Sequence, residues 1–316
     1  MELRDADLAV RTRGLTKNFG KRTVVDGLDL AIPRGGVYGF LGPNGSGKST
    51  TMKMLLGLLH PSAGQISLLG EDPWGEARAR LMPRIGSMIE HPPGYGHLTG
   101  AENMRLLARL LNLETTRIDR ALELVRLTDH RDRLQRTYSL GMKQRLGIAM
   151  ALAREPELLI LDEPTNGLDP AGIQEIRTTM RALADAGRTV VVASHLLGEI
   201  EQIADSVSIM GRGRVIATGE LEEFLNDGSG YVAVEIDDVP AAFETLRQAG
   251  FDGQLVGEQL RVTRDEGLDP AAVARVLGEA DLWPRHLSLQ RSSLESVFLE
   301  LTEDERLTTT QGRAVA

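Results

Sequence analysis

The chain has 316 residues, which is enough for two domains, and its 41% hydrophobic and 26% charged residues are typical of a globular protein. Its 36 Lys and Arg residues against 45 Asp and Glu residues give a net charge of −9, which argues against nucleic-acid binding because phosphate contact needs clustered cations. The absence of cysteine excludes disulfides, thiolate metal sites and cysteine nucleophiles.

The first ten residues, MELRDADLAV, include acids and lack the apolar segment that marks a signal peptide. No apolar run approaches the roughly 18 residues that a membrane-spanning helix needs. We therefore expect any role at a membrane to depend on a partner protein.

The first part of the chain alternates apolar strands with helices. Residues 37–42, VYGFLG, predict a buried strand that ends in a glycine-rich turn, and residues 50–59 predict the helix that follows it. Residues 90–157 contain periodic Leu, Met and Ala, which predicts a helix-rich segment. The alternation indicates an α/β core with a helical subdomain.

Two further strands and a hairpin complete this part. Residues 157–164 and 188–195 each contain an uninterrupted apolar run, as strands inside parallel sheets do. Residues 207–220 predict a hairpin with a glycine turn. We expect one domain over residues 1–226, with a mostly parallel sheet and an antiparallel flank.

The pattern changes after residue 226. Strand, helix, hairpin, helix and strand patterns follow one another over residues 231–237, 239–250, 253–264, 268–281 and 284–291. The order β-α-β-β-α-β predicts a small α+β, ferredoxin-like module over residues 227–306, with a last amphipathic helix at 292–303. Residues 224–231 read as a linker, and residues 307–316 as a disordered tail.

The segment GPNGSGKST fits the phosphate-loop pattern G-x-x-x-x-G-K-[ST], and its position between a strand and a helix supports the match. Backbone N–H groups of such a loop cradle phosphates, Lys48 would reach the β- and γ-phosphates, and Ser49 would complete a Mg²⁺ shell. The alternative is a glycine-rich turn that binds nothing. The candidate nucleotide-binding residues are Gly42, Pro43, Asn44, Gly45, Ser46, Gly47, Lys48, Ser49 and Thr50.

Two adjacent acids end the strand LLILDEP. Asp162 lies at the carboxyl end of the strand, where P-loop enzymes place an acid that faces Mg²⁺. Glu163 follows it, points differently, and is a candidate general base for the attacking water. The alternative is that both acids only solubilise a strand end, which the nearby phosphate loop makes less attractive.

These motifs together resemble the ATP-binding-cassette ATPases. The octapeptide YSLGMKQR, residues 138–145, is similar to the family signature, NGLDP at 166–170 to its D-loop, and His195 to its switch histidine. Phe19 matches the aromatic residue that stacks on adenine, and Val24 would complete that pocket. The motifs occur in the family's order over about the first 220 residues.

The resemblance implies that ATP is held between two chains packed head to tail. Ser139 and the N–H of Gly141 would then contact a γ-phosphate bound by the partner, and Asp169 would shape the partner's site. His195 would bond the γ-phosphate and help to hold the attacking water. The alternatives are a helix cap at Ser139, a structural histidine, and a plain Asp-Pro turn at Asp169.

Departures from the family pattern are also present. Leu140 replaces a glycine and Met142 a glutamine in the signature, so a side-chain amide contact is lost. Glu90 stands where the family's Q-loop glutamine is expected, as in the bacitracin-resistance and lantibiotic-immunity branch. A carboxylate there suits Mg²⁺, which gives the candidate metal ligands Ser49, Glu90 and Asp162; the alternative is a solvated loop acid.

The resemblance implies an ATPase subunit that drives transport, with ATP and Mg²⁺ as cofactors. Its partners would be a second copy of the chain and a separate multi-span membrane permease, not nucleic acid, which places it at the cytoplasmic face of the membrane. Tyr95, His97 and Leu98 would help to grip the permease, and export of an antibiotic, peptide or other amphiphile is favoured. The alternative function is a cassette ATPase that acts on ribosomes or nucleic acid.

Overall fold

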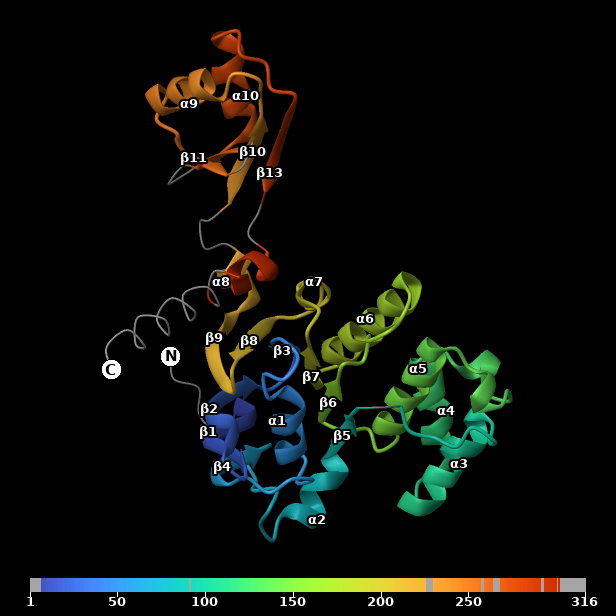
Figure 1. Ribbon diagram of the computed structural model, residues 1–316. Coiled ribbons are helices and arrows are strands. Elements are labelled where there is room, and N and C mark those ends of the chain that lie inside the picture. Colours follow the sequence, from blue (N-terminus) through green and yellow to red (C-terminus); the bar gives the residue numbers. More distant parts are fainter. Residues whose placement is uncertain are drawn as a thin grey trace. The chain divides into compact units, whose positions relative to one another are not determined.

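The computed structural model describes residues 7–90, 92–225, 230–256, 259–263, 268–290, 293–299 and 301. The chain divides into one unit up to Glu220 and a second from Leu221 onward (Figure 1). The division falls slightly before residue 226, because the short helix α8 (Leu221–Leu225) groups with the second unit. The expected tail at 307–316 lies outside the described residues.

A six-stranded sheet organises the first unit (Figure 1). Its order is β5-β6-β7-β3-β8-β9; the first five strands run parallel, and β9 pairs antiparallel with β8. The strands are β3 (Val37–Leu41), β5 (Ile85–Met88), β6 (Leu158–Asp162), β7 (Thr189–Ser194), β8 (Ser206–Gly211) and β9 (Arg214–Glu220). Every residue of β3, β6, β7 and β8 is buried, which explains why these segments are almost uniformly apolar.

Helices connect these strands. The core helices are α1 (Lys48–Leu55), α2 (Arg78–Leu81), α6 (Pro170–Asp185) and α7 (Leu197–Ile200), with a 3₁₀ turn at Met82–Arg84. The helical subdomain contains α3 (Gly100–Leu111), α4 (Thr115–Leu124) and α5 (Leu140–Leu152), with 3₁₀ turns at Thr128–His130 and Gln135–Thr137. None of the helices within the described ranges is long and apolar enough to cross a bilayer.

A second, three-stranded antiparallel sheet belongs to the first unit. Its order is β2-β1-β4, formed by Arg22–Pro33, Leu8–Phe19 and Ala63–Leu68. One continuous core joins side chains of both sheets with those of α1: Leu15 and Leu28 from this sheet, Phe40 and Ile160 from the large sheet, and Met52 from the helix. Burial of each such side chain contributes about 1.5–3 kcal/mol, so the first unit folds around one apolar centre.

The second unit has the predicted β-α-β-β-α-β order. Its elements are β10 (Tyr231–Glu235), α9 (Val239–Gln248), β11 (Asp252–Val256), β12 (Gln259–Thr263), α10 (Pro270–Glu279) and β13 (His286–Gln290). The sheet order β11-β12-β10-β13, antiparallel throughout, is that of a ferredoxin-like fold. Val232 and Val234 pack with Leu246 and Leu277 in its core. Residues 294–299 are helical.

Phe40 provides a test of this core. Its side chain is fully buried in β3, so Phe40→Ala is expected to lower the free energy of unfolding of the first unit by about 3–5 kcal/mol. Urea denaturation followed by the fluorescence of Trp74 in a Trp283→Phe background reports on that unit, because Trp74 is its tryptophan. The control Phe19→Ala removes a half-exposed ring and should cost less than about 1 kcal/mol; equal losses would contradict the assignment of Phe40 to the core.

Candidate nucleotide-binding site

The predicted phosphate loop connects β3 to α1 and is shaped by close packing. Gly47, the N-cap of α1, has φ of +107°, and a Cβ on it would lie 2.9 Å from the carbonyl oxygen of Val24. A Cβ on Gly42 would lie 2.6 Å from the carbonyl oxygen of Met210. Only glycine fits at both ends of the loop, which lets the backbone turn toward the N-terminus of α1, where an anion is favoured.

Lys48 is held inside the loop. Its Nζ donates to the carbonyl oxygen of Gly42 at 2.7 Å and lies 3.6 Å from the Glu163 carboxylate. The side chain is only 5% exposed, and burial lowers the pKa of Lys48, while the nearby acids Glu163 and Asp162 act in the opposite direction. The ammonium is therefore already placed where a phosphate oxygen could replace the carbonyl.

Asp162 and Ser49 form the candidate metal side of the site. Burial raises the pKa of Asp162 above its ordinary value, and a hydrogen bond from Ser49 partly offsets this effect. Asp162 Oδ1 is buried and has no hydrogen-bond partner in the described part of the chain. An unpaired buried carboxylate oxygen beside a hydroxyl is a good oxygen donor pair for a divalent cation.

This donor set fits Mg²⁺ that arrives with a nucleotide. Within the described ranges, no group of three or more His, Asp or Glu side chains could hold a metal alone. Mg²⁺ is typically bound through one or two carboxylates, substrate phosphates and water, so few protein ligands suffice.

Glu163 contacts the last predicted catalytic residue, His195. Glu163 Oε2 lies 2.8 Å from His195 Nδ1, and its other oxygen faces Lys48. Glu163 follows β6 with φ of +50°, a left-handed conformation that costs energy outside glycine. Its N–H donates to the carbonyl oxygen of Ala193 at 2.9 Å. The strand end therefore turns the Glu163 side chain toward Lys48 and His195.

Ser139 and Asp169 begin two helices. Ser139 Oγ accepts from the N–H of Met142 at 3.2 Å and caps α5. Asp169 Oδ1 accepts from the N–H of Gly172 at 3.0 Å and caps α6. The helix-cap and turn interpretations of these residues are therefore correct within one chain. The side-chain bonds that the structure gives Ser139 and Asp169 stay within their own helices and do not involve the phosphate loop.

The predicted adenine platform lies at the end of β1. Phe19 is 50% exposed, and Lys17 Nζ lies 5.2 Å from its ring centroid. Val24, partly buried on β2, presents its carbonyl oxygen to Gly47. The β1–β2 hairpin thus packs against the phosphate loop at Val24 and Val25, and the exposed Phe19 ring belongs to the same hairpin.

Glu90 has a partner that the sequence did not indicate. Glu90 follows β5 with φ of +65°, and its Oε1 lies 2.5 Å from the Nζ of Lys53 on α1. Glu90 also acts on Asp162 by raising that group's pKa. The loop acid is thus not simply solvated, although its side chain is 55% exposed. Lys53 lies four residues after Ser49 on the same helix face, but this spacing does not reveal its contact with Glu90.

Comparison with known proteins shows the family of the chain. The ABC transporter family profile matches residues 25–166. The chain is 42% identical over 245 residues to the bacitracin transport ATP-binding protein BcrA of Enterococcus faecalis, covering 77% of this chain and 79% of that one. It is 40% identical over 314 residues to the daunorubicin/doxorubicin resistance ATP-binding protein DrrA of Streptomyces peucetius, covering 93% and 92%.

Solved structures lead to the same conclusion. The ATP-binding subunit of an ABC transporter superposes with a TM-score of 0.62 at 30% identity, over 69% of this chain and 92% of that one. An ATP-binding cassette in its ADP conformation gives a TM-score of 0.63 at 25% identity, over 70% and 95%. With its phosphate loop, strand-end acids and His195 assembled at one sheet edge, the chain belongs to the ATP-binding-cassette transporter family and is an ATP-hydrolysing subunit of that family.

Proposed function

We propose that the chain hydrolyses Mg²⁺-bound ATP between two copies of itself and thereby drives export through a separate membrane permease. The observation that carries the proposal is the contact of Glu163 with both Lys48, at 3.6 Å, and His195, at 2.8 Å. A carboxylate between a phosphate-binding lysine and an imidazole is suited to orient a water molecule against a γ-phosphate.

Each residue of the site has a role in this proposal. Lys48 exchanges its carbonyl partner for phosphate oxygens, and the loop N–H groups fix the phosphates. Glu163 accepts the proton of the attacking water, while His195 keeps its carboxylate oriented. Asp162 and Ser49 would hold Mg²⁺, which neutralises charge that develops on the phosphates.

Ser139 and Gly141 would supply the second half of the site from the partner copy. Ser139 caps α5 with one lone pair, and a hydroxyl can still donate its proton while accepting. The open start of α5 also favours an anion through the helix dipole. Capping and phosphate binding are therefore compatible at the same residue, and Asp169 would act across the same interface.

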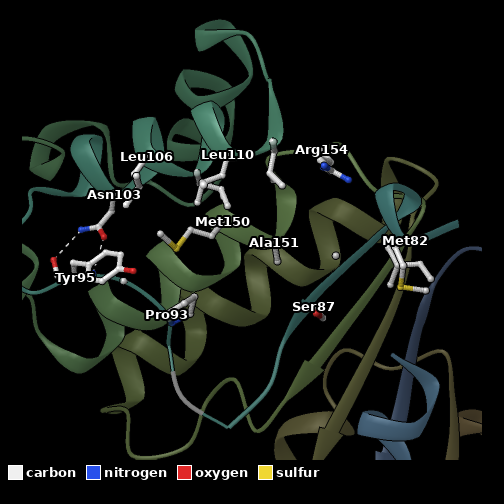
Figure 2. A pocket seen from close by; sticks show the side chains of 15 residues that line it. Met82, Ser87, Pro93, Tyr95, Asn103, Leu106, Leu110, Met150, Ala151 and Arg154 are labelled. Carbon is white, nitrogen blue, oxygen red and sulfur yellow. Dashed lines mark hydrogen bonds between the residues drawn. The ribbon is translucent and has the colours of Figure 1, made fainter. Parts of the chain in front are cut away.

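A pocket beside β5 would receive the permease (Figure 2). It has a volume of about 500 Å³ and lies between the loop after β5 and helices α3 and α5. Leu106, Leu110 and Met150 contribute apolar walls. The side-chain oxygen of Asn103 accepts from the backbone N–H of Tyr95 at 2.7 Å and holds that residue in place. An apolar pocket with a polar margin suits a short amphipathic segment.

Of the residues expected to grip the permease, Tyr95 lines this pocket, and its ring tilts against that of His97 with centroids 5.8 Å apart. Leu98 carries a backbone contact, since its carbonyl accepts from Gln135 at 2.8 Å. The pocket is built partly from the loop that contains Glu90, so docking there would be linked to the nucleotide site through one segment.

The named relatives suggest the cargo. BcrA is a bacitracin transport protein, and DrrA a daunorubicin and doxorubicin resistance protein; a lantibiotic transport ATP-binding protein, SrtF of Streptococcus pyogenes, is 42% identical over 69% of this chain and 96% of that one. We infer that the cargo is an amphiphilic antibiotic or peptide and that the chain works at the cytoplasmic face of a membrane. The second unit would regulate the ATPase or support its dimer.

The metal side of the site predicts a stability effect. Because burial raises the pKa of Asp162, the folded chain holds that proton more tightly than the unfolded chain, and stability falls as pH rises through the window between the two pKa values. Asp162→Asn should therefore stabilise the nucleotide-free protein near pH 7 by about 0.5–2 kcal/mol and remove the stabilisation that Mg²⁺ adds to a bound ATP analogue.

Urea denaturation as a function of pH measures the effect of Asp162→Asn. The gain over the parent protein should shrink as pH falls below the folded-state pKa of Asp162, where the parent is protonated too. Asp185→Asn, at an exposed acid on α6, is the control. A loss of stability in Asp162→Asn at pH 7, with the Mg²⁺ effect intact, would contradict the assignment.

The catalytic role of Glu163 is tested together with the dimer. Glu163→Gln should reduce ATP turnover by about 10²–10⁴-fold while it keeps ATP binding, so that a dimer accumulates in size-exclusion chromatography with light scattering. Adding Ser139→Arg should return the variant to a monomer without loss of ATP affinity, because Ser139 would serve the partner's nucleotide. Parental turnover in Glu163→Gln would show that the base is misassigned, and lost ATP affinity in the double variant would place Ser139 in its own chain's site.

The docking pocket is tested with two leucines. Leu110 lines the pocket and is 74% exposed, whereas Leu124 on α4 is 41% exposed and outside the pocket lining. Leu110→Asp should reduce co-purification with a co-expressed permease subunit by roughly tenfold, since a charge would enter an apolar contact. Leu124→Asp should have no such effect; equal recovery of both variants would exclude this pocket as the docking site.

A further inference from the structure

An ion pair links the phosphate-loop helix to the loop after β5. Lys53 Nζ and Glu90 Oε1 are 2.5 Å apart, with side chains 34% and 55% exposed. Exposed pairs of this kind add little to folding stability. The importance of this pair therefore depends on what its two charges do to their neighbours.

The pair lies beside the candidate metal site. Ser49 and Lys53 are four residues apart on α1, so their side chains lie on one helix face and about one turn apart. Glu90 is close enough to Asp162 for its negative charge to raise the pKa of that carboxyl. The Glu90 carboxylate thus affects Asp162 of the candidate metal site and also pairs with Lys53, one helical turn from Ser49.

The charge of Glu90 has to be balanced if the site is to bind a nucleotide. Asp162 and Glu163 already bring two carboxylates to the phosphate loop, where Lys48 is the lysine that contacts Glu163. A third carboxylate would repel the phosphates of ATP, most strongly when no Mg²⁺ accompanies them. Lys53 supplies a positive charge in direct contact with Glu90.

We propose that Lys53 is a positioning residue that neutralises and orients the Glu90 carboxylate, so that an acid can occupy this loop position without repelling the nucleotide. The inference rests on the proposed binding of Mg²⁺ and ATP at Asp162, Ser49 and Lys48. It predicts that Lys53 governs how strongly nucleotide affinity depends on Mg²⁺, although Lys53 touches neither the phosphates nor the cation.

The test compares binding of the non-hydrolysable analogue AMP-PNP in EDTA with binding in excess Mg²⁺. Lys53→Met removes the charge and keeps much of the aliphatic stem. It should weaken binding about tenfold in EDTA, where Lys53 no longer balances the charge of Glu90 against the phosphates, and distinctly less in Mg²⁺, where the cation compensates. Lys53→Arg should bind as the parent protein does in both conditions.

Two further variants separate charge compensation from a structural role. Lys53→Met combined with Glu90→Gln should recover the parental affinity in EDTA, because the repelling charge is gone. Arg80→Met breaks the exposed pair between Arg80 and Glu71, whose N–O distance is 2.7 Å. It should leave the affinity for AMP-PNP unchanged both in EDTA and in excess Mg²⁺. Equal weakening of Lys53→Met with and without Mg²⁺, or no recovery in the double variant, would overturn the inference.

The same experiment distinguishes this inference from the proposed function. Lys48→Met should lose AMP-PNP binding in both conditions. A parent protein that binds no better than Lys48→Met would overturn the proposed function and this inference together. Normal binding by the parent, with the same Mg²⁺ dependence in Lys53→Met, would overturn only the role of Lys53.

Discussion

The site depends on the parallel register of four strands, of which β3, β6 and β7 are fully buried and β5 is partly exposed. In a parallel sheet, all carboxyl ends lie at one edge, and here Leu41 pairs with Ser194 while Asp162 pairs with Ala193. The phosphate loop, the acids, the Glu90 loop and the switch histidine each follow one of these strand ends. Apolar side chains of the sheet thus fix the geometry of the candidate site, because a shift in register would move every site residue relative to the others.

The same edge concentrates unfavourable features. Asp162 is buried with an unpaired oxygen, Lys48 is buried among backbone carbonyls, and Glu163 has a left-handed backbone. Each is costly in the nucleotide-free chain, and in the proposed function a phosphate–cation ligand would relieve or use each of them. The apolar core therefore offsets the destabilisation that these buried polar groups cause. Such a balance is common where function requires polar groups away from water.

The elements that the sequence predicted correctly are those that one local pattern marks clearly. Fully buried strands are apolar throughout, so β3, β6 and β7 could be recognised, and the glycines of the phosphate loop have a fixed spacing. The β2-β1-β4 sheet was not predicted, because bulges such as those between Thr12 and Leu15 shift the register of β1 and break the alternation that marks a strand. The Lys53–Glu90 pair was missed because 37 residues separate its members, and no local pattern encodes such a contact.

The two helix starts that the proposed dimer would use contact each other inside a single chain. A Cβ on Gly167 would lie 3.0 Å from the side chain of Leu140, and one on Gly141 would lie 3.7 Å from that of Leu168. The start of α5 and the segment that precedes α6 are therefore packed against each other. If Ser139 contacts one nucleotide and Asp169 shapes a partner's site, both act from one packed unit, so a displacement at either is carried to the other. Coupling between two ATP sites then requires no long pathway, only the contact of Leu140 with the backbone at Gly167.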